Sequence, residues 1–210
     1  MKNVIDITLP LCPDVPVFPG DPSPTVELLS SIAQGDRLTA SKLELAAHVG
    51  THVDLPAHFV KDGKILGDYA VERFLGPAWV LDLSDVQTEI RPDRLAGEAI
   101  PEKRHLLLKT RNSPLLQDPK FREDYVHLAE DAARYLLAHR PLSIGFDYYS
   151  LDPADSTSFA AHRQCAEADL PVFVCLALRH VPAGDCWFAG LPLQVPQLEG
   201  APVRAIIWHA

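Results

Sequence analysis

Several features that would assign this chain to a special class of protein are missing from its sequence. No apolar run approaches the length of a membrane span, and the four cysteines form no CxxC pair. There is no block of Lys and Arg, and 19 basic residues stand against 28 acidic ones, a formal net charge of −9. We therefore expect neither nucleic-acid binding nor membrane insertion. Isolated cysteines favour small buried side chains over a disulfide or a cysteine-rich zinc site.

The remaining composition is that of an ordinary globular protein. Of the 210 residues, 47% are hydrophobic and 22% are charged, so the chain can bury a core without disulfide bonds or a structural metal ion. Nineteen prolines against eleven glycines indicate many loops, because proline is kept out of helix interiors and central strands. Asp6 interrupts what would be the apolar core of a signal peptide, so we expect a cytoplasmic protein. With no internal repeat or linker, we expect one domain over residues 1–210.

Strand patterns recur along the whole chain. Residues 4–9 alternate apolar and polar side chains with the period of a half-buried strand. Five further segments are rich in β-branched and apolar residues, namely 78–83, 105–110, 142–147, 171–178 and 203–208. The proline-rich residues 10–24 predict an irregular loop, and long loops of this kind bind ligands more often than they merely connect elements.

Two helices are expected in the C-terminal half. Residues 124–139 carry an apolar face opposite a charged one. The second helix begins near Asp155 or Ser156, each a good N-cap, and carries His162. The alternation of strands and helices predicts an α/β or α+β domain with a mixed sheet, in which the apolar run 172–178 is a central strand.

One short segment concentrates side chains that bind metals. Four nitrogen and oxygen donors occupy even positions within residues 48–58: His48, His52, Asp54 and His58. In an extended chain alternate side chains share one face, so all four would point the same way. Six extended residues span about 20 Å, so the chain must bend to bring the donors to one point. Gly50 and Pro56 permit such bends.

The same residues also have a purely structural interpretation, because a single histidine on an apolar face is usually a satisfied core residue. Four polar groups clustered on one face without a cation would, however, compete for hydrogen-bond partners. Imidazole nitrogens with a carboxylate oxygen suit Zn²⁺, and also Mn²⁺ or Fe²⁺. We therefore favour a metal site.

Residues 48–58 resemble the HxGTHxDxPxH signature of the cyclase family of metal-dependent hydrolases, whose best-known members are the bacterial kynurenine formamidases (arylformamidases). Further matches follow in order along nearly the whole chain, at residues 16–21, 107–113, 145–153, 191–193 and 198–205. The resemblance implies a swivelling β/β/α-type α/β domain with a mixed sheet. It also implies a homodimer or a larger homo-oligomer.

The resemblance assigns roles to individual residues. Carried over by position, the metal ligands are His48, His52, Asp54 and His162, with Asp54 bridging two ions. His58 is implied as the general acid/base. Phe18 stands where kynurenine formamidases usually have a tryptophan that contacts the substrate, so Phe18 is the expected substrate-binding aromatic residue.

One ligand of the family pattern is absent. In the family a glutamate bridges both metals from the strand that matches residues 171–176, and here the alignment places Val174 at that position. Because valine cannot ligate, we expect one ion, Zn²⁺ or Mn²⁺, rather than two, with an open position of the kind found in catalytic sites. Glu167 or Asp169 could substitute only through a local shift of the alignment. His180 is the one further histidine worth inspecting as a compensating ligand.

The expected reaction is hydrolysis of an amide, formamide or lactone on a small aromatic metabolite. N-formylkynurenine, a metabolite of tryptophan catabolism, is the substrate that the family implies. Metal-activated water would attack the carbonyl, and His58 would carry the proton. Phe18, with Tyr148 or Tyr149, would flank the ring. Two alternatives stay open: a lactonase or ring-closing activity on another aromatic metabolite, and a degenerate metal- or ligand-binding protein without turnover.

Overall fold

Eight strands form one mixed sheet in the computed structural model, which describes residues 4–209. In spatial order the strands are β1 (Val4–Asp6), β12 (Gly200–Trp208), β11 (Gly184–Pro192), β5 (Leu75–Asp82), β7 (His105–Lys109), β9 (Ser143–Phe146), β10 (Val172–Val174) and β4 (His52–Asp54). Strand β4 pairs with both β10 and β12, so the sheet closes into a barrel-like arrangement. The pairs β5–β7, β7–β9 and β9–β10 are parallel and the others antiparallel, which confirms the expected mixed sheet.

All six strands predicted from the sequence are present, with shorter or shifted bounds. The run 171–178 forms a strand only over β10, which lies between β9 and β4 as a buried central strand. Strand β11 was not predicted. Its sequence GDCWFAGLP contains Gly, Asp and Pro, which are depleted in strands, and it is held as a strand by pairing with β5 on one side and β12 on the other.

The core has two compartments, one on each face of the closed sheet. One cluster fills the inside of the barrel and includes Val53, Phe173 and Phe188. The other lies between the outer face and the helices and includes Val172, Val174 and Cys165. Because side chains alternate along a strand, β4 and β10 each supply residues to both compartments. The donors on β4 therefore face the helices and not the barrel interior.

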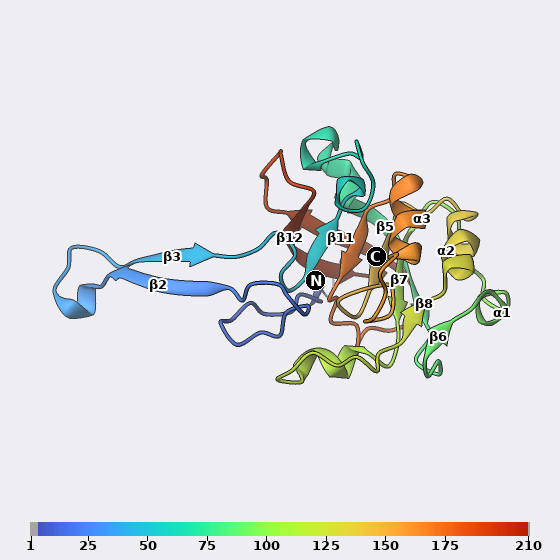
Figure 1. Cartoon of the computed structure of the whole chain (residues 1–210), viewed down its shortest axis with the longest axis horizontal. Coiled ribbons are helices and arrows are strands. Elements are labelled where there is room, and N and C mark those ends of the chain that lie inside the picture. Colours follow the sequence, from blue (N-terminus) through green and yellow to red (C-terminus); the bar gives the residue numbers. More distant parts are fainter. Residues whose placement is uncertain (1–3, 210) are drawn as a thin grey trace.

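Three α-helices, α1 (Pro92–Leu95), α2 (Glu130–Leu137) and α3 (Ala160–Glu167), lie to one side of the sheet (Figure 1). Five 3-10 turns complete the helical elements: η1 (Ile32–Gln34), η2 (Pro56–His58), η3 (Leu66–Asp68), η4 (Val71–Phe74) and η5 (Ser113–Gln117). Two short strands, β6 (Glu89–Ile90) and β8 (His127–Leu128), form a separate parallel pair.

Both predicted helices begin later than expected. Helix α2 begins at Glu130 rather than at residue 124, because His127 and Leu128 pair with β6 instead of joining the helix. Helix α3 begins at Ala160, and neither Asp155 nor Ser156 caps it. For α2 a nonlocal strand pairing overrides the local pattern, and for α3 the Asp152 carboxylate accepts hydrogen bonds from the backbone N–H groups at its start.

A long hairpin of β2 (Thr25–Ser30) and β3 (Ala40–Glu44) projects from the body of the molecule, and we name it the arm (Figure 1). The irregular loop expected over residues 10–24 is present ahead of it. The sequence did not predict the arm.

Three of the four cysteines are buried as expected, whereas Cys12 is exposed. All four are free, and the buried ones are Cys165, Cys175 and Cys186. Among residues 4–209 the helices are too short or too polar for any of them to cross a bilayer.

A buried histidine in the sheet predicts a loss of stability in acid. His105 is fully buried, its Nδ1 lies 2.7 Å from Ser143 Oγ, and burial lowers its pKa to about 4. The unfolded chain takes up the proton near the ordinary pKa of 6.5, so stability falls as the pH drops from 6.5 towards 4. We expect denaturant unfolding to give about 2 kcal/mol less stability at pH 5 than at pH 7 from this group.

The His105→Gln protein isolates this effect. Its stability difference between the two pH values should be smaller than that of the unaltered protein by about the same 2 kcal/mol. Equal pH dependence of the two proteins would show that His105 does not set it.

Candidate metal and active site

The donors of residues 48–58 come together because the chain bends on both sides of β4. Only His52–Asp54 is a strand, and Val53 between them points into the barrel core. Before the strand, Gly50 adopts a φ of 59°, a conformation that costs glycine little. After it, Pro56 begins the 3-10 turn that carries His58. The bends expected at Gly50 and Pro56 are confirmed.

The threonine of this segment anchors the bend. Thr51 is buried, and its hydroxyl accepts a hydrogen bond from the backbone N–H of Leu9 at 2.7 Å. The same hydroxyl donates to the carbonyl of Cys175 at 2.7 Å. These bonds fix the start of β4 against the segments that follow β1 and β10, so the neighbouring donors are held by rigid backbone.

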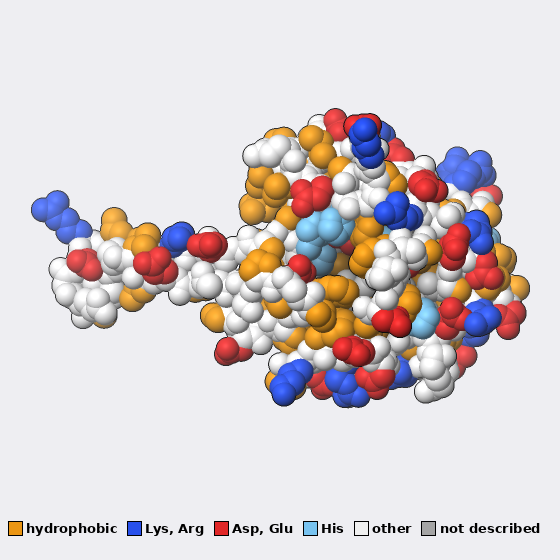
Figure 2. All heavy atoms as spheres, viewed as in Figure 1, with side chains coloured by type: hydrophobic (Ala, Val, Ile, Leu, Met, Phe, Trp, Pro, Cys, Tyr) orange, Lys and Arg blue, Asp and Glu red, His pale blue; other side chains and the backbone are white. Residues whose placement is uncertain are grey.

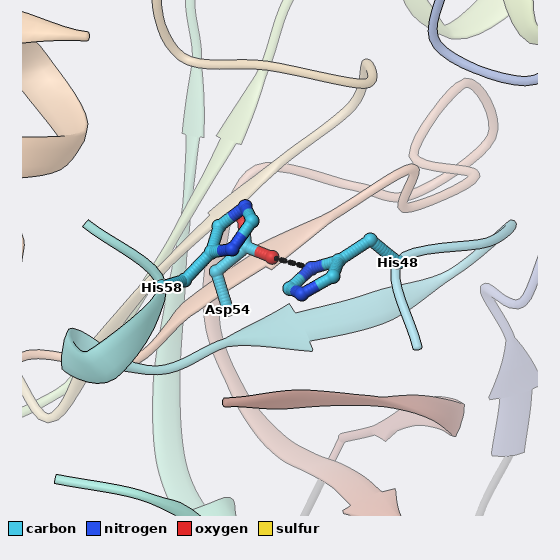
Figure 3. Close-up of side chains that lie close together, drawn as sticks. All are labelled: His48, Asp54 and His58. Carbon is cyan, nitrogen blue, oxygen red and sulfur yellow. Dashed lines mark hydrogen bonds and ion pairs between the residues drawn. The ribbon is translucent and has the colours of Figure 1, made fainter. Parts of the chain in front are cut away.

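The Asp54 carboxylate lies at the centre of the cluster. Its Oδ1 is 2.7 Å from His48 Nδ1 and 3.2 Å from His52 Nε2, and its Oδ2 is 3.6 Å from His162 Nε2, which α3 supplies. The His58 ring stacks on that of His48 with centroids 3.8 Å apart. Figure 3 shows the Asp54 carboxylate pointing towards His48, with the His58 ring beside it. Every expected metal or catalytic residue therefore lies in one cluster.

The second ring nitrogens show that two of these imidazoles are oriented towards Asp54. His162 Nδ1 lies 2.6 Å from Asp152 Oδ2, and His52 Nδ1 lies 2.8 Å from the carbonyl of Gly50. The remaining nitrogen of His162, Nε2, is buried and has no hydrogen-bond partner. Metal-binding histidines have this arrangement, in which a carboxylate or carbonyl fixes the ring and frees the other nitrogen for the cation. The residues present fit a divalent ion.

The ionised carboxylate of Asp54 supports the same assignment. Burial raises the pKa of Asp54, but the His52 and His48 imidazoles outweigh it and hold that pKa well below its usual value. Burial lowers the pKa of His48, whereas hydrogen bonds to Asp54 and Glu199 raise it, to about 9. The His58 side chain is partly exposed, but the loss of solvent around its ring lowers its pKa to about 4. The cluster thus offers an ionised carboxylate beside a neutral imidazole that can accept a proton.

Two functional residues were missed by the sequence analysis, because their roles depend on contacts distant in the chain. Asp152 accepts hydrogen bonds from the backbone N–H groups of Ala161 and His162 at 2.8 and 3.1 Å, so one carboxylate both caps α3 and orients its histidine. Glu199 Oε1 lies 3.1 Å from His48 Nε2. Asp152 and Glu199 fall inside the matched segments 145–153 and 198–205, which was the only available signal.

The glycine after Glu199 explains how β12 approaches the site. A Cβ added at Gly200 would lie 2.5 Å from His48 Cε1, so only glycine lets the imidazole pack against this strand. Glu199 then meets the outer nitrogen of His48 while Nδ1 faces Asp54.

We expect Glu199→Gln to weaken metal binding about 10-fold, because the carboxylate that orients a ligand histidine is lost. Competition with a chromogenic chelator measures the affinity directly. Glu72→Gln, an exposed glutamate outside the cluster, is the matched control and should bind like the unaltered protein. Equal metal affinity of the two variants would show that Glu199 does not contribute to metal binding.

Val174 lies beside the donors. It pairs with His52 across the antiparallel β10–β4 ladder, and Val172 pairs with Asp54. Directly opposed residues of such a pair share one face of the sheet, so the Val174 side chain is on the donor side. It is fully buried in the outer core cluster.

The residues considered as replacements for the missing glutamate lie elsewhere. Asp169 forms an ion pair with Lys64 and a 2.5 Å hydrogen bond with the Tyr69 hydroxyl. Neither Glu167 nor His180 lines the cavity over the cluster, and both are exposed.

A cavity of 410 Å³ opens above the donors, and Figure 2 shows imidazoles at the surface of the hollow near the middle of the body. Aromatic side chains form much of its wall: Phe18, Phe59, Tyr149 and Phe159. The Tyr149 hydroxyl donates to the carbonyl of Pro16 at 2.8 Å, which ties the proline-rich loop to the site. Tyr148, the other tyrosine considered, does not line the cavity and instead donates to the carbonyl of Arg122.

An α/β domain with a buried cluster of oriented histidines around a carboxylate defines a class of candidate metalloproteins. Within it, this chain belongs to the cyclase family, whose model, described as "Putative cyclase", matches residues 5–153. Kynurenine formamidase from Bacillus cereus is 34% identical over 203 residues, which cover 97% of this chain and 96% of that protein. The corresponding enzyme from Bacillus anthracis is 33% identical over the same shares.

Solved structures share the whole fold. A predicted metal-dependent hydrolase from Bacillus stearothermophilus superposes with a TM-score of 0.87 at 27% identity, and the match covers 100% of both chains. Isatin hydrolase A from Labrenzia aggregata has a TM-score of 0.87 at 22% identity over 99% of this chain and 94% of that one. The fold expected from the sequence is confirmed.

Proposed function

We propose that this chain is a metal-dependent hydrolase that cleaves an amide or formamide on a small aromatic compound, with N-formylkynurenine as the first candidate. The observation that carries the proposal is the convergence of His52 and His162 on Asp54, each with its other ring nitrogen held by a hydrogen bond. The kynurenine formamidases that are a third identical to this chain support the choice of substrate.

Four residues are proposed to hold the ion: His48, His52, Asp54 and His162. A bound divalent cation would lower the pKa of water towards neutrality and polarise the carbonyl of the substrate. We propose Zn²⁺, with Mn²⁺ as the alternative, because imidazole and carboxylate donors suit both. One ion is proposed rather than two, because Val174 offers no ligand.

His58 is proposed as the general acid/base. Its ring is stacked on that of His48, at the edge of the cavity. Its lowered pKa keeps the imidazole neutral at neutral pH, so a ring nitrogen is free to accept a proton from the attacking water and pass it to the departing amine. Phe18 and Tyr149 would flank the aromatic ring of the substrate.

Hydrolysis by the metal-supplied protein tests the proposal. Release of kynurenine from N-formylkynurenine, followed by absorbance, is the expected result, and a chelator should stop it. Turnover of an aryl lactone alone would favour the lactonase alternative. A protein that binds metal but turns over no aryl formamide, amide or lactone would be the degenerate binder, and the proposal would be wrong.

A second copy of the chain is the proposed partner, and the arm is the proposed contact. Cross-strand pairs place Val26, Leu28 and Leu43 on one face of the arm, where they are 58%, 53% and 58% exposed. The opposite face carries Glu27 and the ion pair of Lys42 with Glu44. A two-stranded hairpin is marginally stable alone. We therefore expect another protein surface to pack on the exposed apolar face of the arm.

The surface area fits a dimer. The accessible surface is 10601 Å², about 900 Å² more than surface scaling gives a monomer of this mass. Stable interfaces remove about 800 Å² per partner. The apolar face of the arm also continues into an apolar groove of 380 Å³ lined by Leu43, Leu45 and Leu193 among others, and Figure 2 shows apolar side chains on the arm away from the body. Self-association through this face would bury the apolar side chains of the arm and of the groove.

Sedimentation measures the oligomeric state. We expect a dimer for the unaltered protein and a monomer for Leu28→Glu, which places a charge on the apolar face. Glu27→Gln, on the opposite face of the same strand, should remain a dimer. A monomeric unaltered protein, or a dimeric Leu28→Glu protein, would contradict the proposed contact.

We further propose a cytoplasmic location. The four free cysteines, three of them buried, support it, because disulfides are rare in reducing compartments.

A further inference from the structure

Arg163 lies at the rim of the cavity without a charged partner. It follows the proposed ligand His162 on α3, and it is exposed while His162 is buried. Successive helical residues point about 100° apart, so His162 faces the floor of the site and Arg163 faces its opening. No ion pair among residues 4–209 involves Arg163.

The guanidinium is held in place by a bond that leaves its outer edge available. Arg163 Nε donates to the carbonyl of Ser158 at 2.8 Å, just ahead of α3. Neither Nη group has a hydrogen-bond partner in the described part of the chain. A guanidinium fixed through Nε with both Nη groups open presents the fork that binds a carboxylate in bidentate fashion.

The rest of the cavity suits an aromatic compound that also carries charge. The wall combines the rings of Phe18, Phe59 and Phe159 with two charged side chains of opposite sign, Arg163 and Asp21. Asp21 likewise has no ion-pair partner in the described range 4–209. A neutral aromatic substrate needs neither charge, whereas an α-amino acid group carries one carboxylate and one ammonium.

We propose that Arg163 binds the carboxylate of an aromatic α-amino acid substrate and so selects N-formylkynurenine over neutral aryl amides and formamides. This inference rests on the proposed function, because it takes the donor cluster to be the place where the formamide reacts. Asp21 supplies the matching charge for the ammonium group. Arg163 is thus a specificity-determining residue that holds the end of the substrate remote from the reacting carbonyl.

Binding of the product tests the inference without requiring turnover. Kynurenine and 2-aminoacetophenone share the aminophenyl ketone, but only kynurenine has the amino acid group. Calorimetry on the metal-supplied protein should give tighter binding of kynurenine, and Arg163→Gln should weaken that binding about 10- to 100-fold, the loss expected for a charge-assisted hydrogen-bonded pair. Arg163→Lys keeps the charge but not the planar fork, so its affinity for kynurenine should lie between that of the unaltered protein and that of Arg163→Gln.

Turnover gives the second readout. The ratio of kcat/KM for N-formylkynurenine to kcat/KM for formanilide should fall about 10- to 100-fold in Arg163→Gln, mainly through KM. The exposed Arg179, which lies outside the cavity, provides the control, and Arg179→Gln should leave the ratio unchanged. If both ligands and both substrates respond equally to Arg163→Gln, or none responds, the inference is wrong. If the unaltered protein hydrolyses neither substrate yet binds kynurenine through Arg163, the proposed function fails and the carboxylate site stands.

Discussion

His58→Ala is expected to lower kcat for N-formylkynurenine about 1,000-fold while leaving the bound metal in place, because proton transfer by a positioned side chain contributes roughly 10²- to 10⁴-fold. His58 sits at the end of the 3-10 turn η2, outside the strand that carries His52 and Asp54. Its ring faces the cavity and stacks on His48 without a hydrogen bond to the carboxylate. Removing it therefore takes away a proton carrier and not a buried anchor of the fold.

The control for this prediction is His180→Ala, which removes an exposed histidine outside the cavity and should leave kcat unchanged. Metal analysis of both variants separates the two roles that His58 could have. If His58→Ala loses both the ion and the activity, His58 is a metal ligand. The geometry allows this role, because a ring nitrogen of His58 lies within 4.8 Å of the donor atoms of His48 and Asp54. Retention of full activity would remove it from the mechanism.

Val174→Glu is expected to raise the metal content from about one ion per chain towards two. The new carboxylate would enter from β10 beside His52, on the face shared with Asp54. It would then add the ligand that the cyclase-family pattern has and this chain lacks. Elemental analysis after removal of loosely bound metal measures the stoichiometry.

Val174→Gln separates ligation from packing. The glutamine has nearly the same shape and is also buried, but it offers no charge to a cation, so its metal content should stay near one. A buried carboxylate without a cation costs stability, so Val174→Glu should also gain more in melting temperature from added metal than Val174→Gln does. Unchanged stoichiometry in a folded Val174→Glu protein would show that the missing ligand is placed wrongly.

The local part of the site could be predicted from the sequence because its donors lie within eleven residues. Alternation along a strand placed His52 and Asp54 on one face, and Gly50 and Pro56 marked the bends that bring the flanking histidines inward. His162 was assigned only through the family resemblance, since a single histidine on a helix carries no spacing signal of its own.

Other features depend on contacts that local patterns do not encode. Asp152 orients a histidine ten residues away, and Glu199 meets His48 across a separation of 151 residues. The start of α2 was predicted too early because β8 pairs with a strand far back in the chain. The arm was missed because its apolar residues face solvent in the single chain, where no core imposes a pattern on them.

Anomalous diffraction at the zinc edge, recorded from crystals grown with Zn²⁺, shows directly whether the donor cluster holds a metal ion. We expect one strong peak in contact with Asp54 and the histidines that surround it, and no comparable peak near Val174. Density maps without a peak at Asp54, or with zinc held only by surface residues, would contradict the assignment of this cluster as a metal centre.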